Sequence, residues 1–417
     1  MATAEATGAV APAWRGGFGR LWSAAVLSRL GDGLRGAALP LLAASLTDRP
    51  LLIAAVSACG YLPWLLFGLL GGAVADRVDQ RRAMWGVDLL RGALMAAFAA
   101  AVALGHAAIA LLIALAFALT TLQTLFDNAA TALLPGLVAP AELAGANARL
   151  LTGQQMAGGL LGAPLVPALA AVGAGAPFAV DALTFLAAAA LVASLRTAPP
   201  ERAPRAPGST LRRETAEGLR ALWRDRALRG LCTATALCNI GMGALIATLV
   251  VLVTRWLAAG PGGYAAALAA YTVGGVAGGL AGRRLLARRP LRAILAAGAV
   301  QTAALTAMGT LRSLPALVAA MACFGFMGMV WNIGTRTLMQ QRSPTAMLGR
   351  ISAAFRTVSV SGAPLGALVG GALAGASGAN VPPLFAAALF LPAVLALIPA
   401  ARSPDGPGGG STGPLIN

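Results

Sequence analysis

The chain contains no lysine and a single histidine, His106, among its 417 residues. The lack of lysine excludes ATP hydrolysis at a Walker A loop, because that motif needs a lysine. One histidine also argues against the clusters expected of a membrane-embedded enzyme, such as HExxH, a GxSxG triad or paired His/Asp ligands. We therefore expect no enzyme activity, no metal site and no cofactor.

Charge is also scarce. Only 11% of the residues are charged and 58% are hydrophobic, and the mean hydropathy is +0.78. A soluble domain usually carries about a quarter charged residues, so this composition is typical of a polytopic membrane protein. The four cysteines all lie in apolar runs, which favours buried, inert thiols over a disulfide or a metal site.

Long runs without charge recur along the whole chain. Leu51–Ala75 can cross a hydrocarbon layer of roughly 30 Å, since a helix rises about 1.5 Å per residue. Similar runs are Gly92–Phe126, Leu150–Val180, Gly230–Thr254, Trp256–Gly282, Ala293–Leu311, Ser313–Thr335 and Thr357–Ala401. Gly92–Phe126 holds one helix and part of another, with a turn near Gly105-His106. Thr357–Ala401 holds two helices, with a break around Gly375–Pro383. With helices near Leu21–Leu46 and Pro177–Leu195, we predict an all-α protein of twelve transmembrane helices.

The arginines predict the orientation. All 31 cations are arginine, and the formal net charge is +17. With a cytoplasmic N-terminus, 25 fall in cytoplasmic tails and loops, three in outer loops (Arg49, Arg255, Arg312) and three inside helices (Arg29, Arg35, Arg91). This follows the positive-inside rule, so both termini are expected in the cytoplasm. The charge then needs no nucleic acid partner, and membrane lipids are the expected surroundings. The Ala-, Gly- and Arg-rich composition indicates a GC-rich bacterial genome.

Two halves of the chain repeat one another. Gly162-Ala163-Pro164-Leu165 recurs 200 residues later as Gly362-Ala363-Pro364-Leu365. Asp32 matches Asn239 at an offset of 207, and Gly72, Arg77 and Arg82 match Gly278, Arg283 and Arg288 at 206. These matches predict two six-helix bundles, as transporters often contain. We expect a cytoplasmic tail at 1–20, bundles at 21–195 and 229–401, a linker with an amphipathic helix at 196–228, and a disordered tail at 402–417.

One loop and several shorter segments resemble a known family. Gly72-x3-Asp76-Arg77-x3-Arg81-Arg82 resembles the loop between helices 2 and 3 of the major facilitator superfamily. Further segments resemble its branch of macrolide efflux proteins and enterobactin exporters: Ser28–Asp32 with Ala38–Leu42, Asp88-x2-Arg91, Leu134-Pro135 with Ala146-Asn147, Asp181–Phe185, and Gln340-x3-Pro344 with Gly349-Arg350. Many drug:proton antiporters of this family have an arginine within helix 4, whereas this chain has none between Arg91 and Arg149.

The resemblance implies a secondary transporter that works by alternating access. The expected activity is export of an amphipathic small molecule, such as a drug, antibiotic or siderophore-like metabolite, against proton entry by a monomer in the bacterial cell membrane. Proton-coupled uptake of a small nutrient by the same fold remains an alternative. A non-transporting sensor and a membrane-embedded enzyme are weaker alternatives.

Acidic residues inside helices are the candidate coupling sites, because intramembrane charge is costly. Asp32 lies mid-helix with Arg29 and Arg35 three residues away on either side, within side-chain reach. It either alternates between a proton and an arginine or substrate, or stays ionised and only orders the cavity wall. Asp127 either relays protons or bonds a neighbouring helix. Asp181 either takes part in coupling or simply stabilises the start of its helix as an acid near the N-terminal end.

A second set of residues is assigned to a cytoplasmic gate. In the family, the acid and bases of the loop hold the inner gate closed, and here they are Gly72, Asp76, Arg77, Arg81 and Arg82, extended by Asp88 and Arg91. A plain positive-inside anchor is the alternative reading of the loop.

The remaining candidates concern movement and binding. Gly162, Pro164, Gly362 and Pro364 are candidate hinges, because proline kinks a helix and glycine permits close packing; ordinary packing is the alternative. Gln154, Gln155, Asn239, Trp331 and Asn332 are candidate cavity residues. Phe324, Phe326, Met327 and Met329 either line that cavity or face lipid.

Overall fold

The computed structural model describes residues 16–75, 79–134, 137–138, 143–195, 211–286, 290–344, 347–395 and 397. Within these ranges the secondary structure is helical and contains no strand. Asp76 and Arg77, most of the two predicted tails and the linker residues 196–210 lie outside the described residues.

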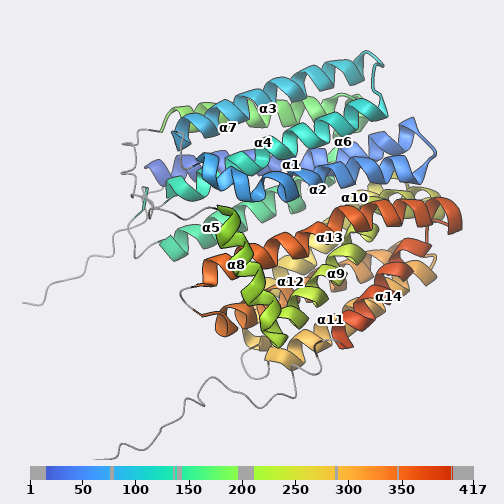
Figure 1. The fold of residues 1–417 in the computed structure, drawn as a ribbon. Coiled ribbons are helices and arrows are strands. Elements are labelled where there is room, and N and C mark those ends of the chain that lie inside the picture. Colours follow the sequence, from blue (N-terminus) through green and yellow to red (C-terminus); the bar gives the residue numbers. More distant parts are fainter. Residues whose placement is uncertain are drawn as a thin grey trace, which may run out of the picture.

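The first half of the chain forms six spans, drawn in blue to green in Figure 1. They are α1 (Gly17–Leu46), α2 (Pro50–Ala75), α3 (Gln80–Ala103), α4 (Ile109–Leu133), a composite fifth span, and α7 (Ala176–Ala193). The fifth span consists of α5 (Leu143–Gln155), the π-helical segment η3 (Met156–Gly162) and α6 (Ala163–Val172). A helix α8 (Leu211–Arg224) then precedes the second half.

The second half repeats this arrangement in yellow-green to red (Figure 1). Its spans are α9 (Arg226–Val251) continued by the π-helical η4 (Leu252–Trp256), α10 (Gly260–Leu286), α11 (Pro290–Thr310), α12 (Leu314–Arg342), α13 (Leu348–Ser377) and α14 (Val381–Leu395). Among the described residues, nine helices are long and apolar enough to cross a membrane. The charged α1, α2 and the shorter α14 complete twelve spans, so the predicted fold class is confirmed.

Local capping explains several helix ends. The Asp79 carboxylate accepts a hydrogen bond from the Arg82 amide at 3.0 Å and begins α3. Asp225 accepts from the amides of Ala227 and Leu228 at 2.8 Å and begins α9. Both are N-cap acids. Their carboxylates bond free amides of the first turn, and their negative charge is stabilised by the positive end of the helix dipole. Acids at these loops therefore fix where α3 and α9 begin.

Each half is held together by close helix pairs. In the first half α3 packs on α7 and α2 on α4, and in the second α10 packs on α12 and α9 on α13. Glycines allow two further close contacts, of α1 with η3 in the first half and of α13 with α9 in the second. A Cβ at Gly33 of α1 would clash with the Gly158 carbonyl of η3, and a Cβ at Gly366 of α13 would clash with the Ile240 carbonyl of α9. The equivalent helix pairs of the two halves thus use the same device.

The two halves meet mainly along α2–α13 and along η3 and α6 with α10. We call the end with the turns at 47–49, 104–108, 173–175, 257–259, 311–313 and 378–380 the outer end, because the arginine distribution predicts that it faces outward. Gly371 of α13 packs against Leu51 and Ala54 of α2 at this end. Arg255 donates to the Asp48 backbone carbonyl at 2.7 Å and pairs with its carboxylate at 3.2 Å. The halves are therefore joined at the outer end.

The helix α8 packs on the opposite, inner end of the second half. Its Glu217 carboxylate pairs with Arg350 of α13 at 2.7 Å, and a Cβ at Gly218 would clash with the Arg350 carbonyl. The sequence of α8 is strongly amphipathic, with apolar residues on one side of the helix and charged residues on the other, as the linker sequence predicts.

Candidate functional site

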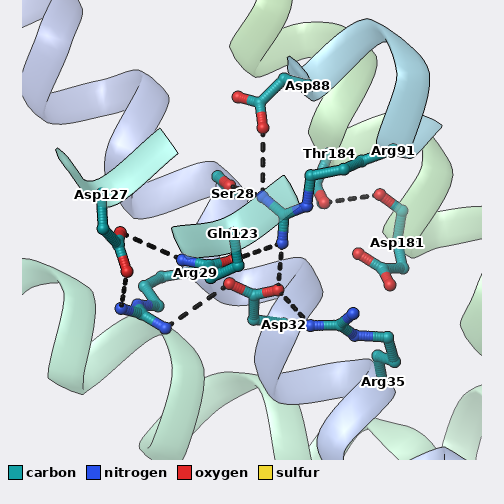
Figure 2. Close-up of polar contacts among 10 residues, drawn as sticks. All are labelled: Ser28, Arg29, Asp32, Arg35, Asp88, Arg91, Gln123, Asp127, Asp181 and Thr184. Atoms are coloured by element: carbon teal, nitrogen blue, oxygen red, sulfur yellow. Dashed lines mark hydrogen bonds and ion pairs between the residues drawn. The ribbon is translucent and has the colours of Figure 1, made fainter. Parts of the chain in front are cut away.

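A buried guanidinium lies at the centre of the first half. Arg91 of α3 is fully buried and donates to four side chains: Ser28 at 3.0 Å, Asp88 at 3.1 Å, and Asp32 and Gln123 at 2.5 Å each. Its guanidinium carbon Cζ also lies 3.8 Å from the centre of the Phe185 ring of α7. These contacts join α3 to α1, α4 and α7, and Figure 2 shows those with α1 and α4. An arginine fork suits this task because it offers five donors in fixed directions.

Asp32 is the acid on which three arginines converge. Its carboxylate lies 2.5 Å from Arg91, 2.6 Å from Arg35 and 3.6 Å from Arg29. Arg29 continues to Asp127 of α4 at 3.5 Å, and Gln123 donates to that same carboxylate at 3.1 Å. The structure thus brings together all four predicted coupling residues and adds Arg91, Asp88 and Gln123.

Asp181 belongs to the same cluster, although the sequence suggested a simple helix-start acid. It lies beyond the first turn of α7, is fully buried, and packs against Gly31 of α1 beside Arg35 and Asp32 (Figure 2). Among the described residues, neither of its carboxylate oxygens has a hydrogen-bond partner. Of the two readings of Asp181, helix-start stabilisation therefore does not account for its position.

The cluster carries one excess negative charge when every group is ionised. It holds the arginines 29, 35 and 91 and the aspartates 32, 88, 127 and 181. Exposure falls across it, from 36% for the Arg29 side chain and 24% for Asp127 to 10% for Asp32 and none for Arg91. One proton would neutralise this group, and its exposed edge at Arg29 and Asp127 offers a route for it.

The residues assigned to the cytoplasmic gate separate in the structure. Asp88 and Arg91 lie deep in the cluster, because Arg91 is about 17 Å along α3 from Gln80. Arg81 instead donates to the Val192 and Ala193 carbonyls at the end of α7, and Arg82 pairs with Asp79 at 3.7 Å. Gly72 lies in the last turns of α2.

The candidate hinges take part in packing within each half. A Cβ at Gly162 would lie 2.9 Å from Gly33 of α1, and one at Gly362 would lie 2.7 Å from the Ala236 carbonyl of α9. Pro164 follows the π-helical η3, whereas Pro364 lies inside the continuous α13. The two repeats therefore share a contact but differ in helix geometry.

A cavity of about 90 Å³ lies inside the second half, among α9, α10, α11, α12 and α14. Three of the predicted cavity residues line it: Asn239, Trp331 and Asn332. Gln154 and Gln155 lie in α5 and are not among its described lining residues. Of the four apolar candidates in α12, Phe324 lines it. Sequence reasoning missed Gln301, which stood as the one amide in the run Ala293–Leu311.

Comparisons with known proteins agree with this architecture. A family model described as Major Facilitator Superfamily matches residues 21–367. An uncharacterized MFS-type transporter of Sinorhizobium fredii is 28% identical over 376 residues, covering 85% of this chain and 88% of that protein.

Solved structures of transporters share the fold. A point mutant of the nucleoside transporter NupG superposes with a TM-score of 0.74 at 13% identity, covering 91% of this chain and 99% of the mutant's chain. A bacterial homologue of the iron transporter ferroportin, in an inward-facing state, gives 0.73 at 14% identity, covering 94% and 100%.

Proposed function

The chain belongs to the major facilitator superfamily, and on that premise we propose that it exports an amphipathic small molecule in exchange for protons. It is a multi-pass membrane transporter, and we place both termini in the cytoplasm of a bacterial cell. Export is proposed from the motifs shared with the macrolide and enterobactin exporters. The buried cluster around Asp32 and Arg91 carries the proton-coupling proposal.

Charge balance supports a proton as the coupling ion. A group of charges out of water is costly unless it is paired, and here four aspartates face three arginines. Binding one proton cancels the excess charge. Asp32 is the hub of the exchange, since each of the three arginines contacts it and any change in its charge alters all three contacts.

The contacts between the halves support alternating access. The Arg255–Asp48 contacts and the packing of Gly371 on α2 lie at the outer end. At the inner end, the Arg82–Asp79 and Arg350–Glu217 pairs each stay on one side of the interface. Among the described ion pairs, the one that joins the two halves therefore lies at the outer end. The gate loop at Gly72–Arg82 and the glycine–proline elements at 162–164 and 362–364 are proposed to change contacts as the halves rock.

Replacing Asp32 with Asn tests the coupling role. Cells expressing the wild type should accumulate less of a toxic substrate than cells expressing Asp32→Asn, because the variant keeps the side-chain shape but loses the titratable charge. Accumulation is measured across a broad panel of amphipathic compounds, with membrane levels of both proteins matched. Equal accumulation for every compound would rule out the proposed role of Asp32.

The direction of transport is tested separately in vesicles. For an exporter, an active compound from that panel should stimulate proton movement in inside-out vesicles, where the cytoplasmic face meets the added compound. Stimulation only in right-side-out vesicles would favour the uptake alternative.

A further inference from the structure

The cavity in the second half has two buried polar atoms with nothing to bond. Trp331 of α12 and Gln301 of α11 are each 4% exposed, and both line the cavity. Among the described residues, the Trp331 indole nitrogen and the Gln301 carbonyl oxygen have no hydrogen-bond partner. Buried polar atoms are almost always paired, so these two point to a ligand group. They offer one donor and one acceptor.

The walls of the cavity are aromatic. The Phe324 ring centre lies 6.2 Å from that of Tyr271 and 5.8 Å from that of Phe390, and Trp331 adds a fourth ring. Such rings pack well on a flat apolar group. The volume of about 90 Å³ is smaller than the roughly 150 Å³ of an engineered cavity that binds benzene, so the cavity suits at most a single small ring of a substrate and not a fused ring pair.

The surroundings are uncharged. None of the described lining residues carries a charge, and the sequence has no Asp or Glu from Arg226 to Pro404. Asn239, which lines the cavity, occupies the repeat position of Asp32. At the same offset Arg91 corresponds to Gly298, which packs against the Trp331 ring. Where the first half holds an ion pair, the second half has an amide and an indole.

A cation is disfavoured even against these aromatic rings. Rings alone can bind a cation through their faces. Here, however, the indole N–H presents the positive end of its dipole, and no carboxylate of the described residues lines the cavity. A buried charge without a partner is costly. The observations therefore favour a neutral group.

We propose that this cavity binds a neutral, planar heterocyclic group of the substrate, such as a cyclic amide. The Trp331 N–H donates to an acceptor on that group, and the Gln301 carbonyl accepts from a donor on it. Asn332 is exposed and Asn239 is half-buried, and these two amides form the rim through which the group enters. The inference rests on the proposed function, because it names part of the transported molecule.

Binding to the purified full-length protein tests the proposal without any proton gradient. The probe is radiolabelled 2-pyridone, a flat one-ring cyclic amide, which competes with N-methyl-2-pyridone (no donor), benzene (no polar atom) and N-methylpyridinium (a cation). We expect 2-pyridone to bind best, the two neutral analogues to bind more weakly, and the cation to compete least. No binding of any neutral probe, or stronger competition by the cation, would overturn the proposed ligand class.

Two variants assign the two contacts. Gln301→Leu should weaken the binding of 2-pyridone about tenfold, the effect of one lost hydrogen bond, and abolish its preference over N-methyl-2-pyridone. Trp331→Phe should weaken the binding of both lactams but not that of benzene. Gln340→Leu and Trp256→Phe are the matched controls, because both residues lie outside the cavity lining. Unchanged binding in both test variants, with melting temperatures near the wild type, would refute the site.

The result is separable from the proposed function. If probes bind as expected but no compound moves protons in vesicles, the cavity stands and the coupling proposal fails. If compounds move protons but Gln301→Leu and Trp331→Phe bind them like the wild type, the cavity proposal fails and coupling stands.

Discussion

Arg91 donates to Ser28, Asp32, Asp88 and Gln123 from a site with no exposed surface. Arg91→Leu should therefore destabilise the protein strongly, by about 3–5 kcal/mol, since it leaves the buried Asp88 carboxylate without its arginine and removes one of the three arginines that contact Asp32. The stability of Arg91→Lys should lie between that of the wild type and that of Arg91→Leu, because an ammonium keeps the charge but lacks the planar fork. Melting temperatures in detergent measure both effects.

Arg82→Leu is the matched control for Arg91. Arg82 is exposed and its ion pair with Asp79 spans 3.7 Å, so its loss should change stability by less than about 1 kcal/mol. Equal melting temperatures for Arg91→Leu and Arg82→Leu would contradict a structural role for the buried cluster.

Asp181 allows charge to be removed without removing a hydrogen bond, because its carboxylate oxygens have no partner among the described residues. Asp181→Asn should change stability by less than about 1 kcal/mol, whereas Asp32→Asn weakens charge-assisted bonds worth about 1.5–3 kcal/mol each.

Asp181→Asn also brings the formal charge of the cluster to zero without a proton. It should therefore lose proton movement but keep substrate exchange in proteoliposomes. Retained substrate-driven proton uptake, read with an internal pH dye, would refute this assignment.

Sequence reasoning found Asp32 and its flanking arginines because they lie on one helix, three residues apart. It placed Asp88 and Arg91 in the gate because they follow the charged loop closely in sequence, although each residue of α3 moves them about 1.5 Å inward. Asp181 and Gln301 could not be paired with α1 and α12 from sequence, since only the packing of distant helices brings them together.

Most of the transmembrane helices could be predicted from the sequence. Charge-free runs and their interruptions predicted the spans, because a helix in lipid must satisfy its own backbone and carry few charges. The turn predicted near Gly105-His106 falls between α3 and α4, and the break predicted around Gly375–Pro383 falls at 378–380, between α13 and α14. The π-helical segments η3 and η4 were not predicted, because a π-turn changes the backbone register without changing the apolar composition.

Two glycines of α1 test the close helix contact with η3. Gly33→Ala should destabilise the protein by about 1–3 kcal/mol, since its Cβ would clash with the Gly158 carbonyl and force the helices apart. Gly36→Ala, three residues away, meets nothing within 4 Å and should be neutral or stabilise by up to about 1 kcal/mol. Both are read from melting temperature. Similar values for the two variants would show that α1 and η3 are not in close contact.

The whole molecule divides its chemistry between the halves. The first half holds all the membrane-embedded acids, and the second holds the uncharged aromatic cavity. In the proposed function, a proton taken up by the first half changes how the second half is exposed, and the α2–α13 and α6–α10 contacts that join the halves would transmit this change. This coupling requires an interface that opens and closes, and the contacts of Arg255 at the outer end provide a place to test it.

Arg255 holds the halves together by donating to the Thr47 and Asp48 carbonyls and pairing with the Asp48 carboxylate. Arg255→Ala should loosen the outer end. A single cysteine replacing Ala54 of α2, which is fully buried against α13, should then react several-fold faster with an impermeant maleimide added outside, in a background without the native cysteines. Arg312→Ala is the control, because among the described residues Arg312 bonds the Trp256 carbonyl, which belongs to its own half. Equal labelling rates in both variants would mean that Arg255 does not hold the outer end closed.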